Sequence, residues 1–418
     1  MPHFGFTPTT HPRRSARRAV LTLLAITLVA ATPVSAAPPA AAANAAVITT
    51  WNSVAVSTIP ANPAAFLNYA FVHLAMYNAV VGITGEYQQY QWQSPAPHNA
   101  SPEAAAAAAA HRVLVTYFPA STATLDAQLA ASLALIPDGG PQDKGIGYGI
   151  RAANRIIQLR ANDGRFAVVT PPTADAAGEY SGPFAVPWLG GVTPLALNSL
   201  QQFDPGSPPA LGTRRYRAEL EEVRKLGALN STDRTARQTT WARYFADVPF
   251  GPMERALQDL ATRHALNISD SARLFAATNT AMADALGTVW NDKLRTMWWR
   301  PISAIRETID DGDPLTVKDE DWEPLITTPP YPDWPSGLCA VISALTASVV
   351  EVSGGVDLNL VSPSQGLRHW DSKAVLDQLA VDARVWSGIH FRTADVVSIG
   401  VGNNTANWTF DHYFAPRD

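Results

Sequence analysis

The sequence has little cysteine and little charge. Cys339 is the only cysteine among 418 residues, so no intramolecular disulfide can form and the fold must depend on core packing. We expect Cys339 itself to be buried in a helix. Charged residues make up 16% of the chain and apolar residues 47%, which is typical of a globular protein. The net charge of −5 argues against nucleic acid as the main partner, because no basic excess is available to neutralise phosphates.

Long apolar runs are also scarce. The residues 19–31 form a run that is too short to span a bilayer, and it follows four arginines between residues 13 and 18. Val34-Ser35-Ala36 then provides a small-residue cleavage site. This pattern predicts a secretory signal peptide at residues 1–36, exported by the Sec or the twin-arginine route, followed by a flexible linker at 37–47. We therefore expect a secreted or extracytoplasmic protein with no membrane span.

The remainder of the chain has mainly helical periodicity. Apolar residues recur at helical spacing in ten segments, and Ser101-Pro102-Glu103 is a typical helix start. The segments are 63–81, 103–119, 145–162, 216–225, 231–245, 252–264, 269–293, 337–351, 373–387 and 394–408. Two stretches rich in proline, 165–212 and 310–335, are predicted to be loops, and no strand pair is evident. The sequence thus predicts an all-α helical bundle in a single domain over residues 48–418.

Three separated segments concentrate groups that bind anions. In the first, Lys293 and Arg300 are seven residues apart, which would place both on one helix face, and Pro301 should end that helix. In the second, Ser336 and Gly337 follow a proline and precede an apolar helix, so that free backbone amides face a potential anion.

The third anion-binding segment contains Arg384 and His390. On a continuous helix these two residues would point about 120° apart, but Gly388 offers a break that could bring them together. The order Lys-x6-Arg-Pro, Pro-Ser-Gly and Arg-x5-His resembles the signature of vanadium-dependent haloperoxidases and type 2 phosphatidic acid phosphatases. The segments 72–79, 103–119, 187–191 and 299–306 resemble the soluble bacterial haloperoxidase-like branch, whose fold is largely α-helical.

The resemblance implies a role for each residue of these segments. His390 would be the single covalent ligand of vanadium, or the nucleophile if the pocket holds phosphate. Lys293, Arg300 and Arg384 would neutralise the oxygens of vanadate, and Ser336 and Gly337 would complete the cradle.

The sequence departs from the family pattern at two positions. Leu338 replaces the histidine of Pro-Ser-Gly-His that transfers protons, a loss that typically costs about 10²–10⁴ in rate. The acid that orients the ligand histidine normally follows it by four residues, but Ala394 stands there and Asp395 comes one later. Three residues are candidate substitutes for the missing proton donor: Cys339, Asp333 and His369.

Four functions remain open on this sequence. The leading one is a vanadate-binding, haloperoxidase-like oxidoreductase that uses hydrogen peroxide to oxidise halide or a small organic substrate. The second is a vanadium-independent enzyme of the same fold that rearranges or cyclises a small organic molecule, which Leu338 favours. The others are an acid phosphatase acting through phospho-His390 and a non-catalytic oxyanion-binding protein.

Overall fold

Helices dominate the computed structural model, which describes residues 44–172, 174, 176–306 and 309–417. The helices in these residues are α1 Ala46–Thr58, α2 Ala65–Thr84, α3 Pro102–Tyr117, η1 Pro119–Ser121, α4 Thr122–Leu133, α5 Gly140–Leu159, η2 Pro187–Gly191, α6 Arg214–Gly227, α7 Ala236–Asp247, α8 Gly251–Arg263, α9 Ile268–Thr296, α10 Pro301–Ile305, α11 Gly337–Ser353, α12 Lys373–Trp386 and α13 Arg392–His412. The predicted all-α fold class is confirmed.

The N-terminal predictions fall largely outside this region. The predicted signal peptide, residues 1–36, lies outside the described residues, as does most of the predicted linker at 37–47. The last two residues of that linker, Ala46 and Val47, are helical, so their assignment to a flexible segment is wrong. The physical reason is that Ile48 and Trp51 of α1 are fully buried, and their packing orders the first turn.

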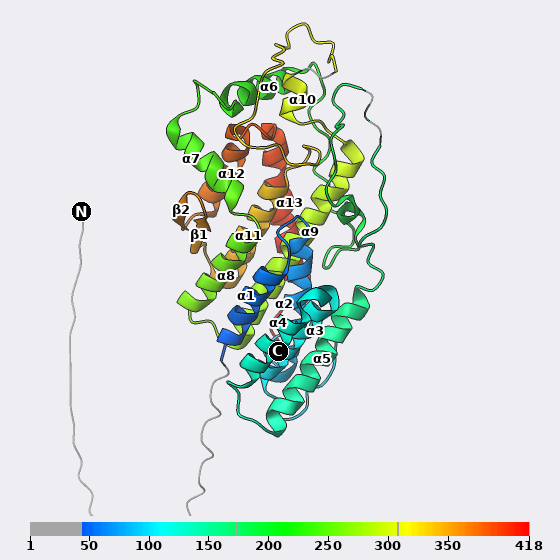
Figure 1. Ribbon diagram of the computed structural model, residues 1–418, viewed down its shortest axis with the longest axis vertical. Coiled ribbons are helices and arrows are strands. Elements are labelled where there is room, and N and C mark those ends of the chain that lie inside the picture. Colours follow the sequence, from blue (N-terminus) through cyan, green and yellow to red (C-terminus); the bar gives the residue numbers. More distant parts are fainter. Residues whose placement is uncertain (1–43, 173, 175, 307–308, 418) are drawn as a thin grey trace, which may run out of the picture. The chain divides into compact units, whose positions relative to one another are not determined.

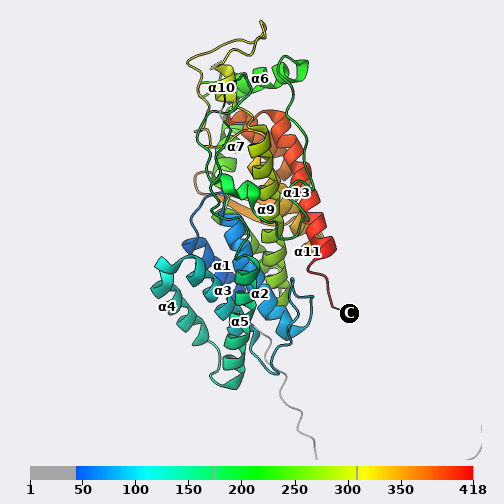
Figure 2. The ribbon, with the colours of Figure 1, turned by 90° about the vertical axis from the view of Figure 1, so that its right-hand side faces the viewer.

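Four long helices, α2, α9, α11 and α13, form the centre of the described region (Figure 1). Helix α9 contacts the other three, while α11 and α13 also pack against each other. Helices α3, α4 and α5 lie together toward one end of α9, and α6 and α10 lie toward the other, as both views show (Figure 2). The end of α9 near α10 carries Lys293.

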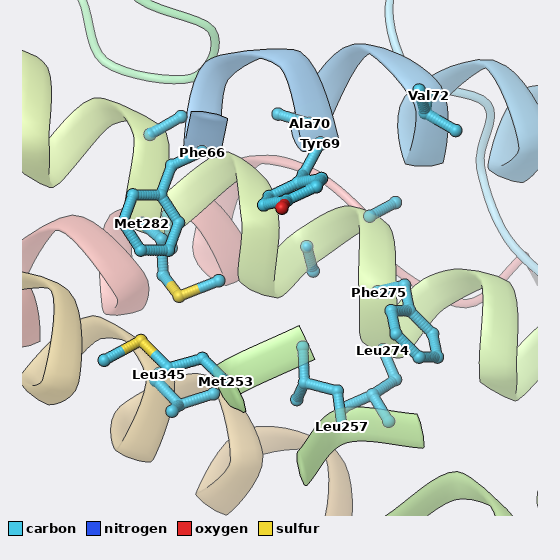
Figure 3. Packing of buried hydrophobic residues seen from close by; sticks show 14 of the residues in the cluster. Phe66, Tyr69, Ala70, Val72, Met253, Leu257, Leu274, Phe275, Met282 and Leu345 are labelled. Atoms are coloured by element: carbon cyan, nitrogen blue, oxygen red, sulfur yellow. The ribbon is translucent and has the colours of Figure 1, made fainter. Parts of the chain in front are cut away.

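The core between these helices is apolar and closely packed. Phe66 and Tyr69 of α2 face Phe275 and Met282 of α9, with Leu345 of α11 nearby (Figure 3). All five are at most 2% exposed. Burying a side chain of this kind stabilises a fold by roughly 1.5–3 kcal/mol. This packing fixes α9 and α11, the two helices that begin or end at the candidate site.

Helix α2 differs from the expectation that the chain contains no segment apolar enough to span a membrane. It has 20 residues, and an 18-residue window of it has a mean hydropathy of 1.4, so the helix is long and apolar enough to cross a membrane by composition alone. However, 83% of that window is buried inside the protein. Helix α2 therefore has the burial of a core helix, and one such helix is weak evidence for a membrane span.

A buried polar cluster lies between α1, α2, α8 and α9. His73 Nε2 lies 3.1 Å from Asn52 Oδ1 and 3.8 Å from the carboxylate of Glu254, and the His73 ring stacks on Phe275. Asn279 Nδ2 donates to Glu254 Oε2 at 3.3 Å. Burial lowers the pKa of His73 to about 3 and raises the pKa of Glu254 to about 8. Both groups are therefore neutral near pH 7.

The expectation of no strand pair is wrong at one place. Strands β1, Leu358–Ser362, and β2, Gly366–Trp370, form an antiparallel hairpin with Leu358 opposite Trp370. Alternate residues of β1 are buried, but in β2 only Trp370 is buried. The alternation of apolar and polar residues that predicts a strand is therefore present in one short strand only. The hairpin packs on α8, and Tyr244 Oη donates to the Leu360 carbonyl at 2.7 Å.

The predicted loop at 165–212 is confirmed as a segment that wraps α9. The carboxylate of Asp284 accepts hydrogen bonds from the amides of three consecutive residues, 195–197, at 2.7–3.0 Å. Gly190 sits so close to α9 that a Cβ there would lie 2.7 Å from the Trp290 carbonyl oxygen. The Trp299 amide donates to the Gly178 carbonyl at 2.8 Å. The loop therefore holds the segment that leads to Arg300.

Candidate oxyanion site

The link between Lys293 and Arg300 differs from the prediction. Helix α9 ends at Thr296, four residues before Arg300, because Met297 adopts a left-handed conformation with φ 44°. Arg300 is extended, and Pro301 begins α10 instead of ending α9. The expectation that Lys293 and Arg300 share one helix face is therefore wrong, although both side chains are fully buried at the same end of α9.

Lys293 is tied to the loop that precedes α11. Its Nζ donates to the carbonyl oxygens of Pro332, Asp333 and Pro335 at 2.5, 2.9 and 2.6 Å. Burial and the charge of Arg300 lower the pKa of Lys293, but all three carbonyls can be satisfied only by its ammonium form. Its three donors are thus used by the backbone, and it can act on an anion only through its charge.

Arg300 links this loop to the segment before α13. Its Nε donates to the Tyr331 carbonyl at 2.8 Å and its Nη1 to the Ile389 carbonyl at 2.6 Å. Nη1 also lies 3.1 Å from His390 Nε2, while Nη2 is buried without a hydrogen-bond partner. Tyr331, which the sequence analysis missed, has its ring 5.0 Å from the Arg300 guanidinium and 5.2 Å from Lys293 Nζ. The Pro-Pro-Tyr-Pro run before the Pro-Ser-Gly motif is the signal that could have identified it.

His390 is brought to Arg300 by the turn at Gly388. Helix α12 ends at Trp386, and Gly388 has φ 79°. A Cβ at Gly388 would lie 2.4 Å from the Gly227 carbonyl oxygen, so both the turn and the close approach require glycine. The predicted break between Arg384 and His390 is confirmed.

Asp333 stands beside His390 in the position of an orienting acid. Its Oδ1 lies 2.7 Å from His390 Nδ1 and 3.8 Å from Arg300 Nη1. The N–H of Nδ1 does not point straight at the carboxylate, so the contact is close but not an aligned hydrogen bond. Burial raises the pKa of Asp333 to about 7. A proton on Nδ1 places the lone pair on Nε2, which faces Arg300 Nη1 at 3.1 Å, and this is the tautomer that a metal ligand needs.

The other candidate proton donors lie elsewhere. Cys339 is buried in α11 as predicted, and its Sγ lies 3.5 Å from Asp395 Oδ1. Burial raises the pKa values of both groups. His369 lies on β2, is 55% exposed and contacts Asn359 at 3.1 Å, so it is a wrong candidate for this site. Asp333 alone of the three contacts His390.

The N-terminus of α11 presents Ser336 and Gly337. The Ser336 amide donates to Ser398 Oγ at 2.8 Å, and the buried Ser336 hydroxyl lies close to the side chains of Asp395 and Cys339. No side chain caps α11, so the amides of its first turn remain available at the positive end of the helix. This end has the properties of an anion cradle.

Arg384 reaches the same place from α12. It is 6% exposed, its Nε has no partner, and among the described residues no hydrogen bond or ion pair to it is found. Burial lowers the pKa of Arg384. A cation that is buried without a partner is unfavourable unless an anion accompanies it.

A cavity of about 340 Å³ opens onto this end of α11. Gly337, Leu338 and Arg384 line it, whereas Lys293 is not part of its wall. The remaining wall residues are Pro63, Phe66, Phe245, Ala246, Pro249, Phe250, Leu286, Trp290, Ile326, Thr327, Pro329, Tyr331 and Val341. Of the predicted site residues, the structure thus brings all six into one neighbourhood, and two of them reach the cavity.

The fold agrees with that of known proteins. Residues 273–417 match the family model of the VCPO second helical-bundle domain. The vanadium chloroperoxidase of Curvularia inaequalis is 32% identical over 132 residues, and this match spans only 26% of the present chain and 22% of that relative.

Solved structures extend the comparison to most of the chain. A bacterial vanadium-dependent iodoperoxidase matches with a TM-score of 0.74 and 20% identity, covering 89% of this chain and 96% of that one. A holo-type bacterial vanadium-dependent chloroperoxidase matches with a TM-score of 0.70 and 14% identity, covering 89% and 97%. The chain therefore has the vanadium haloperoxidase fold, and the predicted resemblance is confirmed.

Proposed function

We propose that this protein is a haloperoxidase-like oxidoreductase whose buried site binds vanadate and which uses hydrogen peroxide to oxidise halide or a small organic substrate. The observation that carries the proposal is that buried Arg384, whose Nε has no hydrogen-bond partner, lines one cavity together with the uncapped start of α11. An oxyanion at this place would satisfy both.

The charge balance of the neighbourhood supports an anion. Lys293, Arg300 and Arg384 are three buried cations. Asp333 faces them, but burial raises its pKa to about 7, and the pKa of Asp395 lies well above its usual range. With a pKa of about 7, Asp333 is only partly ionised near pH 7, so the carboxylates neutralise only part of the positive charge, and a bound oxyanion would supply the missing negative charge.

The unsatisfied polar atoms fit the same ligand. Arg300 Nη2 and Arg384 Nε are buried without hydrogen-bond partners, and each can donate to an oxyanion. His390 would bind the metal through Nε2, because its pKa is lowered well below its usual value by burial and by the nearby cations, so that the ring is neutral. Bound vanadate would act as a Lewis acid that activates hydrogen peroxide. Phosphate could occupy the same cradle.

Leu338 limits what the site can do with protons. Its side chain lines the cavity at the position of the family's proton-transferring histidine. A hydrocarbon side chain can neither donate nor accept a proton, so turnover should be slower by about 10²–10⁴ than with a positioned acid–base group. The same lack disfavours phosphatase chemistry through phospho-His390, because no group protonates the leaving oxygen.

A second candidate is a vanadium-independent rearrangement or cyclisation of a small organic molecule. The observation that favours it is the apolar wall that Leu338 extends next to Arg384. A non-catalytic oxyanion binder would use the same cradle without turnover.

Bromination of a dye by hydrogen peroxide, with and without added vanadate, tests the proposal. The matched variants are Arg384→Met and Arg237→Met, because Arg237 is an exposed arginine on α7. We expect vanadate-dependent bromination in the wild type and in Arg237→Met, and its loss in Arg384→Met. No bromination above the blank would refute the oxidoreductase, and conversion of an organic substrate without vanadate would favour the second candidate.

A further inference from the structure

The cavity has walls that are mainly apolar and rich in aromatic rings. Phe66 at the start of α2, Phe245 at the end of α7 and Trp290 of α9 contribute aromatic surface, with Tyr331 and Phe250 from the loops. Its volume of about 340 Å³ lies within the range of small-molecule sites. Such a wall selects for the apolar body of an organic ligand.

Among the lining residues, Arg384 alone carries a charge. It is nine-tenths buried, and its Nε has no hydrogen-bond partner in the described part of the chain. An arginine fork binds a carboxylate through two parallel hydrogen bonds and does so most strongly where water is excluded. The cavity therefore combines an apolar body site with one anchoring point for an acidic group.

Leu338 joins the apolar wall of the cavity to the anchoring point at Arg384. It lies in the first turn of α11, one residue after Gly337, and both line the cavity with Arg384. A polar side chain at position 338 would hold water between the cation and the apolar wall. With leucine there, the apolar surface extends to the anion cradle, so one molecule can fill both parts.

Phe250 supports the view that the cavity wall is built for a ligand. It has φ 63° and ψ −116°, a backbone conformation that non-glycine residues rarely adopt, and its ring packs 5.3 Å from that of Phe66. Unfavourable backbone conformations persist where the surrounding structure enforces them, and they cluster at binding sites. The effect here is to hold an aromatic side chain against the cavity.

We infer that this cavity binds an aromatic organic acid, whose carboxylate pairs with Arg384 and whose ring lies between the aromatic walls and Leu338. Binding of the acid does not require vanadate. This ligand site is therefore a property in addition to the proposed oxidoreductase activity. Competition between the two anions rests on the proposed function. Because vanadate and the acid would both use Arg384, the acid should displace vanadate and inhibit any vanadate-dependent activity.

Calorimetric titration of the full-length mature protein with 2-naphthoate and its neutral isostere 2-naphthamide tests the inference. We expect the wild type to bind 2-naphthoate at least tenfold more tightly than 2-naphthamide. This comparison needs no variant, so it stands even where a substitution impairs folding. Equal affinities, or no binding of 2-naphthoate, would overturn the inference.

Three variants assign the binding to the cavity. Arg384→Met should remove the preference for the acid while it leaves binding of the amide unchanged, and Val341→Trp should weaken binding of both by filling the cavity. Val375→Trp is the matched control, because Val375 is 51% exposed on the same helix as Arg384, and it should bind both ligands like the wild type. A preference that persists in Arg384→Met would contradict the assignment.

Titration with 2-naphthoate in the presence of vanadate separates this inference from the proposed function. Weaker apparent binding of 2-naphthoate at saturating vanadate supports a shared Arg384. If vanadate fails to bind but the preference for 2-naphthoate remains, the proposed function fails and the inference stands. If vanadate binds but 2-naphthoate does not, the inference alone fails.

Discussion

Replacement of Arg384 by methionine should stabilise the anion-free protein. Arg384 is 6% exposed, its Nε has no hydrogen-bond partner within the described residues, and burial is the largest influence on its pKa and lowers it, so the folded state carries much of the desolvation cost of the charge. Exchanging buried charged groups for apolar residues of similar volume often stabilises proteins by about 1–4 kcal/mol. We expect Arg384→Met to raise the free energy of unfolding by an amount in this range.

The assay is urea denaturation in a buffer free of phosphate and vanadate. Chemical denaturation is preferable to a thermal scan, because with about 2.1 cal/mol/K of unfolding entropy per residue one kcal/mol moves the Tm of a chain of this size by only roughly 1 °C. The exposed control Arg237→Met should stay within about 0.5 kcal/mol of the wild type.

Added oxyanion should make the wild type more stable than Arg384→Met, which is the reverse of the order expected without an anion. Vanadate at 100 times its Kd stabilises a protein that binds it by about 2.7 kcal/mol, and Arg384→Met should not gain this amount. If Arg384→Met is destabilised by more than about 1 kcal/mol without any anion, the guanidinium has a favourable partner in the folded protein and the reasoning is refuted.

Four further predictions follow from the site and the fold. Leu338→His should raise the vanadate-dependent bromination rate by about 10²–10⁴, whereas Val341→His, which places the same group deeper in the cavity, should not; equal rates in both would contradict the role of position 338. Asp333→Asn should weaken vanadate binding by about 10–100-fold through loss of the orientation of His390 but should strengthen phosphate binding, because a negative charge is removed; calorimetry with both anions checks this. The pKa of Glu254 is raised from 4.5 to about 8 by burial, so the folded state keeps its proton while the unfolded state loses it, and stability falls as pH rises through this window; Glu254→Gln should remove about 1.4 kcal/mol per pH unit of that fall between about pH 5.5 and 7 in urea titrations. Export should remove residues 1–36, and mass spectrometry of the secreted protein should find its N-terminus at residue 37; an intact N-terminus would contradict the predicted signal peptide.

The helical architecture could be predicted from the sequence because periodicity and capping signals are local. The Ser101 hydroxyl caps α3 as predicted, accepting a hydrogen bond from the Ala104 amide at 3.1 Å. The end of α9 could not be predicted in the same way, because the hydrogen bonds that hold Met297 and Trp299 come from the loop at 165–212. The β-hairpin was missed because β2 buries only Trp370.

The chemistry of the candidate site was predictable as a set of residues but not as a set of contacts. The motif order identifies Lys293, Arg384 and His390, yet nothing local to Lys293 shows that its ammonium group is taken by three carbonyls of the loop before α11. The position of Asp333 next to His390 likewise depends on where two distant loops meet. Sequence spacing cannot supply such information, because it fixes neighbours along an element and not across elements.

The most direct test of the central claim is calorimetric titration of the mature protein with vanadate. We predict one vanadate bound per chain in the wild type and in Arg237→Met, with phosphate as a competitor and with binding lost in Arg384→Met. Absence of vanadate binding to the folded wild type, or equal binding in Arg384→Met, would contradict the claim that Arg384 and the start of α11 form an oxyanion site.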